Sequence, residues 1–439
     1  MPGKSLNWKQ IFYIFAFSIL SFTSLHAQYL SNGNFLNSDS AFKASTPNSG
    51  RLWGYAFGDA YYKTHSDSLT RGGSNQYTGI PANRTAFQFR RIYLGYDYNI
   101  TSKFAAELLL AAEDNFPAGQ GTPSAATTGD QTLNNKLTFY IKLANIRWKN
   151  IWKGTDLVVG QVATPSFPLL TEKIWNYRSI ERTISDIRRT PSYDMGATLQ
   201  GVFDPVKGGS NYGYDVMIGN GSSAKPEADN FKWFYGDVWA KFLDKRLVFD
   251  LYADYERLNW VPTWHHSRQM LKGFVAYSIP GSSPTAPTAL TIGVEGFINN
   301  LKNDVFATHT TGGKVDTLSS AAKGISMYVH GNIIPDKLRF FARVDMYNPD
   351  NKVSNGVYSK YVENTGNYND NAFPPGSTAA NGDETYKQTF ITAGLDFTPA
   401  KNVHFMPNIW YNHYTSQLNN PSKDYDLVLR CTFFFTFGK

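Results

Sequence analysis

The sequence predicts an all-β fold, a transmembrane antiparallel up-and-down β-barrel of sixteen strands with short turns at one end and long loops at the other. Three features support this prediction: an N-terminal export signal, a regular alternation of short and long polar connectors, and a final strand with one continuous apolar face. A barrel of this kind satisfies its backbone hydrogen bonds between strands, and its lipid-facing side chains alternate with lumen-facing ones.

The N-terminus has the pattern of a secretory signal peptide. Lys4 and Lys9 precede an apolar run over residues 11–22, and small residues offer a cleavage site before Gln28. The run is shorter than the roughly 20 residues that a spanning helix needs. We therefore expect a signal peptide over residues 1–27, a short periplasmic segment over 28–50 and an outer-membrane barrel over 51–439.

The composition agrees with a barrel that has a polar lumen. Aromatic residues make up 15% of the chain, yet the mean hydropathy is negative, as expected when aromatic girdles surround a wet interior. The net charge of +7 falls to +5 without the two signal lysines, because 40 basic residues then face 35 acidic ones. This surplus is too small to indicate a nucleic-acid partner.

The connectors along the chain alternate in length. The short ones are residues 99–102, 149–155, 204–211, 243–246, 280–288, 335–337 and 399–401, and the long polar stretches are 64–85, 114–135, 163–193, 220–230, 258–267, 300–323, 349–384 and 414–423. Short periplasmic turns opposite long external loops are typical of outer-membrane barrels.

The segments between these connectors give the sixteen strands, an even number that places both termini on the periplasmic side. The predicted ranges are 51–63, 86–98, 103–113, 136–148, 156–162, 194–203, 212–219, 231–242, 247–257, 268–278, 289–299, 324–333, 338–348, 385–398, 402–413 and 424–437. A barrel of this size leaves an aqueous channel, whereas an eight-stranded one is filled by its own side chains.

Several predicted strands divide into an apolar and a charged face. In the final strand, leucines, phenylalanines and Cys431 share one parity, and Arg430 lies on the other with two threonines. Residues 247–256 and 338–347 alternate in the same way. Charge on the lipid face costs about 2–4 kcal/mol at mid-membrane, so we expect the charged parity to face water. Agreement between strands disfavours the alternative, a soluble β-sandwich.

The third long stretch differs from a purely solvated loop. It holds Lys173, Arg178, Arg182, Arg188 and Arg189 together with a tryptophan, tyrosines and several aliphatic residues. Folded inward, it would narrow the channel and place guanidinium groups in the path of solutes, where they pair well with phosphate and carboxylate oxygens.

A second interpretation of the same loop stays open. Its arginines would pair with Glu172, Glu181 and Asp186 and hold the loop against the barrel wall.

A series of short motifs in order resembles the phosphate- and polyphosphate-selective porin family (O/P-type outer-membrane porins) and looks like its Bacteroidetes branch. The motifs are Arg90-Arg91-Ile92-Tyr93-Leu94-Gly95, Gly160-Gln161, Arg178-Ser179-Ile180-Glu181-Arg182, Asp194-Met195-Gly196, Gly219-Asn220-Gly221, Phe341-Ala342-Arg343-Val344-Asp345 and Asn348-Pro349. The resemblance covers the chain from about residue 51 onward.

The resemblance implies a trimeric, water-filled pore with an arginine-lined constriction. Carried over by position, Arg90, Arg91, Arg178 and Arg182 match the basic positions of the family best, and Arg188, Arg189, Lys173 and Arg343 join them as candidate anion-binding residues. Strand parity places Arg91 toward water but Arg90 with the lipid-facing residues, so Arg90 lies near a strand end or its parity is misassigned. Asp250, Asp254 and Glu256 on the lumen face speak against strict phosphate selectivity.

The predicted function is therefore passive diffusion of small hydrophilic solutes through an outer-membrane porin, with a mild preference for anions such as phosphate. The alternative is a surface-binding or adhesion barrel with a plugged lumen. No catalytic motif accompanies the His265-His266 pair, so we expect neither an enzyme, a metal nor a cofactor. Expected partners are small anions or other small hydrophilic solutes, outer-membrane lipid, the barrel assembly machinery and two further copies in a homotrimer.

Overall fold

The computed structural model describes most of the barrel. It describes residues 47–72, 75–113, 132–133, 136–188, 191–205, 210–224, 226–227, 230–261, 264–282, 288–363, 385–418 and 422–438. The predicted signal peptide, residues 28–46 of the predicted periplasmic segment and Arg189 lie outside the described residues.

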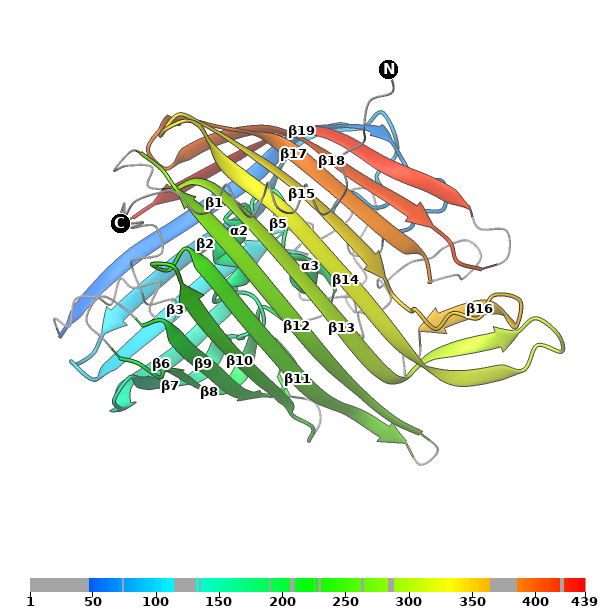
Figure 1. Cartoon of the computed structure of the whole chain (residues 1–439), viewed down its shortest axis with the longest axis horizontal. Coiled ribbons are helices and arrows are strands. Elements are labelled where there is room, and N and C mark those ends of the chain that lie inside the picture. The colour runs from blue at the N-terminus through cyan, green and yellow to red at the C-terminus, as the bar shows by residue number, and fades with distance from the viewer. Residues whose placement is uncertain are drawn as a thin grey trace, which may run out of the picture.

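Sixteen antiparallel strands in the described part of the chain form a closed barrel (Figure 1). Each barrel strand pairs with its neighbours along the chain, and β1 closes the ring because it pairs with both β2 and β19. The barrel strands are β1 (Ser49–His65), β2 (Thr85–Asn99), β3 (Phe104–Glu113), β6 (Tyr140–Trp152), β7 (Thr155–Ala163), β8 (Tyr193–Val202), β9 (Tyr212–Gly219), β10 (Trp233–Phe242), β11 (Leu247–Val261), β12 (Trp264–Pro280), β13 (Thr288–His309), β14 (Val315–Ile334), β15 (Leu338–Asn348), β17 (Lys387–Ala400), β18 (Val403–Thr415) and β19 (Lys423–Phe437).

Each of the sixteen predicted strands overlaps one of these, so the predicted fold class is confirmed. The turn-side rim, where the short turns lie, is also where β1 begins and β19 ends, since Gly54 pairs with Phe437. The described residues of β4 (Thr132–Leu133) and β5 (Lys136–Leu137) form a separate small hairpin outside the ring. The strand predicted over 136–148 lies instead at Tyr140–Trp152 and continues into the predicted turn.

Two of the predicted long loops are wrong, because their residues extend the strands. The stretch 258–267 belongs largely to β11 and β12, and most of 300–323 belongs to β13 and β14, which are 22 and 20 residues long. The polar composition of these residues is compatible with strand structure because they project past the pairing of β13 with β12, which ends at Lys302.

The projecting part of β13 and β14 is widened by a third strand. β16 (Tyr358–Glu363) pairs with β13 over Val305–His309, on a segment that β12 no longer covers. The three strands extend beyond the rest of the barrel at the long-loop rim (Figure 1). Leu301, Val305 and Tyr361 are buried together in a small core there, which joins the extension to the barrel.

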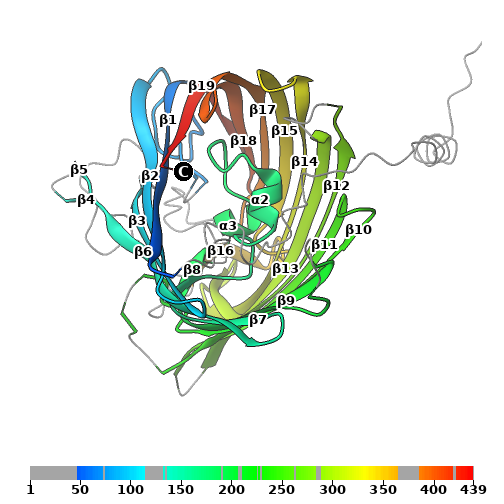
Figure 2. The same cartoon turned by 90° about the vertical axis from the view of Figure 1, so that its left-hand side faces the viewer.

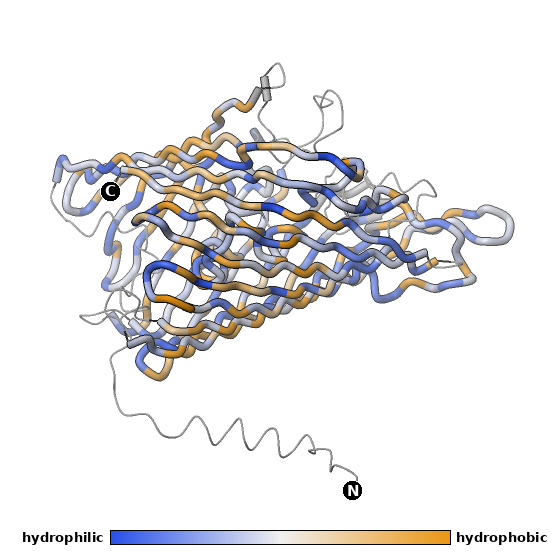
Figure 3. Tube along the Cα trace, turned by 90° about the horizontal axis from the view of Figure 1, so that it is seen from above, coloured by the Kyte–Doolittle hydropathy of each residue, from blue (hydrophilic) through white to orange (hydrophobic). Residues whose placement is uncertain are grey.

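Alternating side chains give the barrel an apolar exterior and a polar interior. In β11, Phe249 and Leu251 are exposed on the outside, whereas Asp250 and Tyr252 are buried inside. β15 and β19 show the predicted parity too, with Arg343 and Arg430 buried on the inner face. The same alternation is visible along the strands in Figure 3.

Two short helices lie within the ring of strands (Figure 2). They are α2 (Thr171–Trp175) and α3 (Ile184–Arg188), and both belong to the segment between β7 and β8. No helix in the described ranges is both long and apolar enough to cross a membrane.

Candidate functional site

The third loop, residues 164–192, folds into the barrel and divides its interior. The side chain of Lys272 in β12 donates to the Thr171 hydroxyl at 3.0 Å, and Nε2 of His330 in β14 lies 2.9 Å from the Ile174 carbonyl. The Ser185 hydroxyl donates to Glu295 of β13 at 2.5 Å. Contacts to three neighbouring strands therefore hold the two helices of the loop against one side of the lumen.

The centre of the loop is a turn whose backbone carbonyls all accept hydrogen bonds from barrel arginines. We name residues 179–182 the clamped turn. Arg90 of β2 donates to the carbonyls of residues 179 and 180 at 2.9 and 3.3 Å, and Arg430 of β19 donates to the carbonyl of residue 180 at 2.6 Å. Arg343 of β15 donates to the carbonyls of residues 182 and 181 at 2.6 and 3.4 Å. Hydrogen bonds from charged donors contribute about 1.5–3 kcal/mol each, so the clamp is a strong attachment.

Glu181 adds side-chain contacts to the clamped turn. Its carboxylate accepts from the indole of Trp410 in β18 at 2.9 Å and from the backbone N–H of Arg182 at 2.9 Å. Burial alone would raise the pKa of Glu181, but the nearby Arg90 and Arg182 guanidiniums and the Trp410 hydrogen bond outweigh it and hold the pKa below its usual value. The carboxylate is therefore charged at neutral pH and contributes to holding the loop.

The three clamping arginines have carboxylate partners in the barrel wall. Arg343 binds Asp345 through two nitrogens, at 2.8 and 2.5 Å. Asp59 lies 3.4 Å from Arg90 and 4.0 Å from Arg430. These side chains are almost fully buried, and with Glu181 of the clamped turn, which lies near Arg90 and Arg430, three carboxylates compensate the three arginines.

A β-bulge explains how both arginines of the Arg90-Arg91 pair enter the lumen. The pairing of β1 with β2 skips one residue, since Phe57 faces Arg91 while Gly58 faces Phe89. A bulge adds one residue to a strand and reverses the parity beyond it. Both arginines are therefore buried on the inner face, each 5% exposed. The parity assigned to Arg90 from simple alternation is wrong for this reason.

A second bulge places Lys142 beside the same region. The pairing of β3 with β6 skips Lys142, because Leu109 faces Leu143 while Leu110 faces Ile141. Lys142 and Arg91 then approach opposite oxygens of Glu113, each at 2.5 Å. Two basic residues share one carboxylate here, so this part of the wall has a surplus of positive charge.

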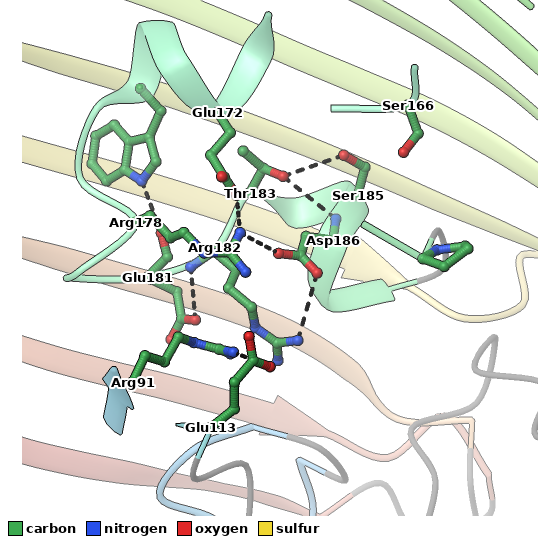
Figure 4. Close-up of polar contacts among 12 residues, drawn as sticks. Arg91, Glu113, Ser166, Glu172, Arg178, Glu181, Arg182, Thr183, Ser185 and Asp186 are labelled. Atoms are coloured by element: carbon green, nitrogen blue, oxygen red, sulfur yellow. Dashed lines mark hydrogen bonds and ion pairs between the residues drawn. The ribbon is translucent and has the colours of Figure 1, made fainter. Parts of the chain in front are cut away.

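The arginines of the loop itself pair mainly with carboxylates of the same loop (Figure 4). Arg178 contacts Glu172 and, at 3.0 Å, Asp186, which also lies 3.7 Å from Arg182. These contacts agree with the second interpretation of the loop. They do not test whether solutes touch the same groups, so the anion-binding role of these residues stays a prediction.

The remaining predicted residues are spread over the lumen. Arg188 lies with its guanidinium 4.4 Å from the ring centroid of Tyr347, and Lys173 faces the cavity beside α2. Arg343 and Arg90 belong to the clamp, whereas Arg91 belongs to the pair of cations around Glu113. Arg189 lies outside the described residues. The predicted set is therefore a group of separate contacts rather than one continuous ring.

The first loop, between β1 and β2, fills another part of the interior. Its Tyr77 is fully buried, donates to Asp59 at 2.9 Å and accepts from Arg430 at 3.4 Å. Lys63 donates to the Tyr77 carbonyl at 2.8 Å. Two loops, not one, therefore narrow the lumen toward the long-loop rim.

An open cavity of about 390 Å³ remains between the third loop and the wall. Its wall includes Trp53, Tyr55 and Phe57 of β1, together with Tyr93 of β2 and Phe434 of β19. These inward-facing aromatics were not among the predicted site residues. Their signal in the sequence is that Arg51, Asp59 and Lys63 share their parity in β1, which marks this face as the inner one.

The described residues contain no group of three or more His, Cys, Asp and Glu side chains that could hold a metal ion.

The comparisons with known proteins give a likeness in structure without one in sequence. No protein-family model and no curated protein matches the chain. The anion-selective porin from Comamonas acidovorans matches 89% of this chain and 100% of its own, with 10% identity and a TM-score of 0.51. The outer-membrane channel DcaP of Acinetobacter baumannii matches 89% and 98%, with 10% identity and a TM-score of 0.54.

OmpF of Salmonella typhi, in a complex with daunomycin, matches 89% of this chain and 98% of its own, with 10% identity and a TM-score of 0.50. The likeness shows a porin fold. At such low identity it does not extend to the phosphate-selective family, so that resemblance stays a prediction from the sequence.

Proposed function

We propose that this protein is an outer-membrane porin through which small hydrophilic solutes diffuse passively. The observation that carries the proposal is the closed sixteen-stranded barrel with a third loop anchored inside it and an open cavity beside that loop. Solutes would pass through the part of the lumen that the first and third loops leave open. Such a passage discriminates by size and charge and needs no covalent chemistry.

The finer part of the proposal is a mild anion preference. Arg91 and Lys142 share Glu113, which leaves one positive charge in excess near the cavity. Arg178 and Arg182 face Glu172 and Asp186, so their charges are balanced. We expect a weak preference for anions, not the strict phosphate selectivity of a site with unpaired arginines.

The experiment that tests this proposal is a planar-bilayer recording of the purified protein. Stable steps of conductance are expected, with a small zero-current potential of anion-selective sign across a potassium chloride gradient. A cation-selective potential would contradict the anion preference and leave a general porin. Complete lack of conductance would contradict the channel itself.

The second candidate function is a surface-binding barrel with a closed lumen. The observation in its favour is the extension of β13, β14 and β16 beyond the long-loop rim, which offers a surface outside the membrane. Both functions can share one barrel, but only the channel predicts conductance. The homotrimer, the barrel assembly machinery and the surrounding lipid remain proposed partners.

A further inference from the structure

The cavity beside the third loop has an unusual lining for a polar channel. Its β1 wall is a row of aromatic side chains at every second residue, Trp53, Tyr55 and Phe57. Passive channels for ions need charged or polar linings, and ligand pockets need apolar and aromatic ones with few polar groups. Its volume of about 390 Å³ lies within the range of about 300–1,000 Å³ found for ligand pockets.

We infer that this cavity binds small, uncharged ring compounds that have a flat apolar face and a hydrogen-bonding edge. The inference rests on the proposed function, because a solute reaches the cavity through the lumen. It adds to that function a class of solute that the channel would retain.

The rings are fixed in orientation by the neighbouring strand. Gly95 of β2 lies under the Trp53 indole, where a Cβ atom would come within 2.3 Å of the ring. Covering of a sheet glycine by a cross-strand aromatic ring is a known packing device. The indole therefore lies flat on the barrel wall, with its other face toward the cavity.

Tyr55 continues this flat surface along β1. Its ring is nearly parallel to Trp53, at 14° and a centroid distance of 6.4 Å, and it contacts Tyr93 at 4.5 Å. Phe434 completes the corner at 6.1 Å from Tyr55. A surface that is already ordered loses little conformational entropy when a solute stacks on it.

The opposite side of the cavity supplies polar groups. Asn176 is exposed at the end of α2, and Ser192 lies near the start of β8; both line the cavity. The Tyr55 hydroxyl makes no hydrogen bond to the described residues. Neutral donors and acceptors across from an aromatic wall suit a ring compound with a polar edge.

Several charged residues around the cavity are engaged with partners of opposite charge, while Glu107 accepts from the Asn145 amide at 2.9 Å and Arg339 lies over the Tyr177 ring. Arg178 contacts Glu172, Lys142 binds Glu113, and His404 lies 2.8 Å from Asp396. A charged solute would have to compete with these pairs, whereas a neutral solute would not. This difference favours an uncharged ligand over an anion in the cavity.

The test measures binding directly, independent of conductance. Glucose and benzyl alcohol each present a ring with one or more hydroxyls, whereas sorbitol is an open-chain polyol of similar size to glucose. Saturation-transfer NMR on the purified protein in detergent should show contact for at least one ring probe and not for sorbitol. Glucose alone would indicate a carbohydrate ligand, and benzyl alcohol alone an aromatic one; either supports the inference.

Two matched variants locate the site. Tyr55→Leu should weaken binding of the ring probe about tenfold, which corresponds to about 1.4 kcal/mol. Tyr214→Leu should leave it unchanged, because Tyr214 also covers a cross-strand glycine, Gly201, but does so on the outer face of the barrel and does not line the cavity. Binding of neither ring probe, equal contact by sorbitol, or equal loss in both variants would overturn the inference.

Channel recordings separate this inference from the proposed function. If the protein conducts ions and the ring probes do not bind, the porin proposal stands and the ring site is wrong. If a ring probe binds but no conductance is found, the cavity is a binding site in a closed barrel and the porin proposal is wrong.

Discussion

Two groups of arginines, one in the barrel strands and one in the third loop, are used in different ways. At the clamped turn, Arg343 and Arg430 are 1% and 0% exposed and donate to backbone carbonyls. In the loop itself, Arg178, which lines the cavity, and Arg182, the last residue of the clamped turn, are 14% and 21% exposed and pair with side-chain carboxylates. The first group fixes where the loop lies, and we propose that the second sets the charge that a passing solute meets. On this proposal, only the second group would contribute directly to selectivity.

The clamped turn should respond most strongly to substitution. Arg343→Ala removes two hydrogen bonds to the turn and leaves Asp345 buried without its partner, which costs about 3–5 kcal/mol. We expect a lower thermal unfolding midpoint and noisier, larger channel currents, because the loop is no longer held. Circular dichroism on heating and single-channel recording measure the two effects.

The matched control for this variant is Arg246→Ala. Arg246 also donates to a backbone carbonyl, that of Leu243 at 2.8 Å, but it lies in an exposed short turn. Its loss should cost less than about 1 kcal/mol. Similar losses in both variants would show that the clamped turn does not depend on its arginines.

Acidification tests the clamped turn through Glu181. The folded-state pKa of Glu181 is held below its ordinary value, so its contribution is complete above the unfolded pKa of about 4.3 and is lost as the pH falls through the lower folded value. We expect currents to be constant from pH 7 to about 5 and to become noisy at lower pH. The measurement is single-channel recording over this pH series.

Glu181→Gln provides the comparison, because it keeps an acceptor for Trp410 but removes the charge. This variant should have noisier currents already at neutral pH and a weaker response to acid. An unchanged acid response would assign the effect to another group.

The sequence was sufficient for the barrel because lipid imposes a simple rule on every strand. Apolar side chains must alternate with the charged ones in strands such as 247–256, and those parities are confirmed. The rule fails at Arg90, where a bulge adds one residue, and nothing in the alternation marks the bulge because both neighbouring arginines are charged. It also does not distinguish a polar loop from a strand that continues past the membrane, as in residues 303–309.

The arrangement inside the barrel could be predicted only in part. The basic and acidic residues of the third loop indicated ion pairs, and Arg178 and Asp186 form one. The clamped turn could not be found in this way, because its acceptors are backbone carbonyls, which every residue has. The aromatic wall of β1 could not be predicted either, because this strand reverses the usual pattern of large apolar residues outside. Its small residues Gly54, Ala56 and Gly58 face outward, and its large aromatic residues face the lumen.

Substitution of the arginines of the third loop itself should have the smallest effect on stability and the largest on ion selectivity. The double variant Arg178→Gln with Arg182→Gln leaves Glu172 and Asp186 without their cations. Glu172 and Asp186 are 18% and 8% exposed, so water can partly replace the lost cations. The cost should therefore stay below that of breaking a fully buried pair, about 3–5 kcal/mol. Because both carboxylates lie in the loop and not in a strand, the barrel should remain folded. The zero-current potential should move toward cations, with a permeability ratio changed about threefold to tenfold.

Removing the same amount of charge elsewhere distinguishes a local effect from a general one. Lys103→Gln with Lys337→Gln neutralises two exposed lysines at the short turns and should leave the potential nearly unchanged, since salt screens exposed charges beyond about 10 Å. If both double variants shift the potential equally, selectivity follows the total charge of the barrel. If only the loop variant shifts the potential, the ions pass beside Arg178 and Arg182. The strand arginines and the loop arginines then have the separate roles that their contacts indicate.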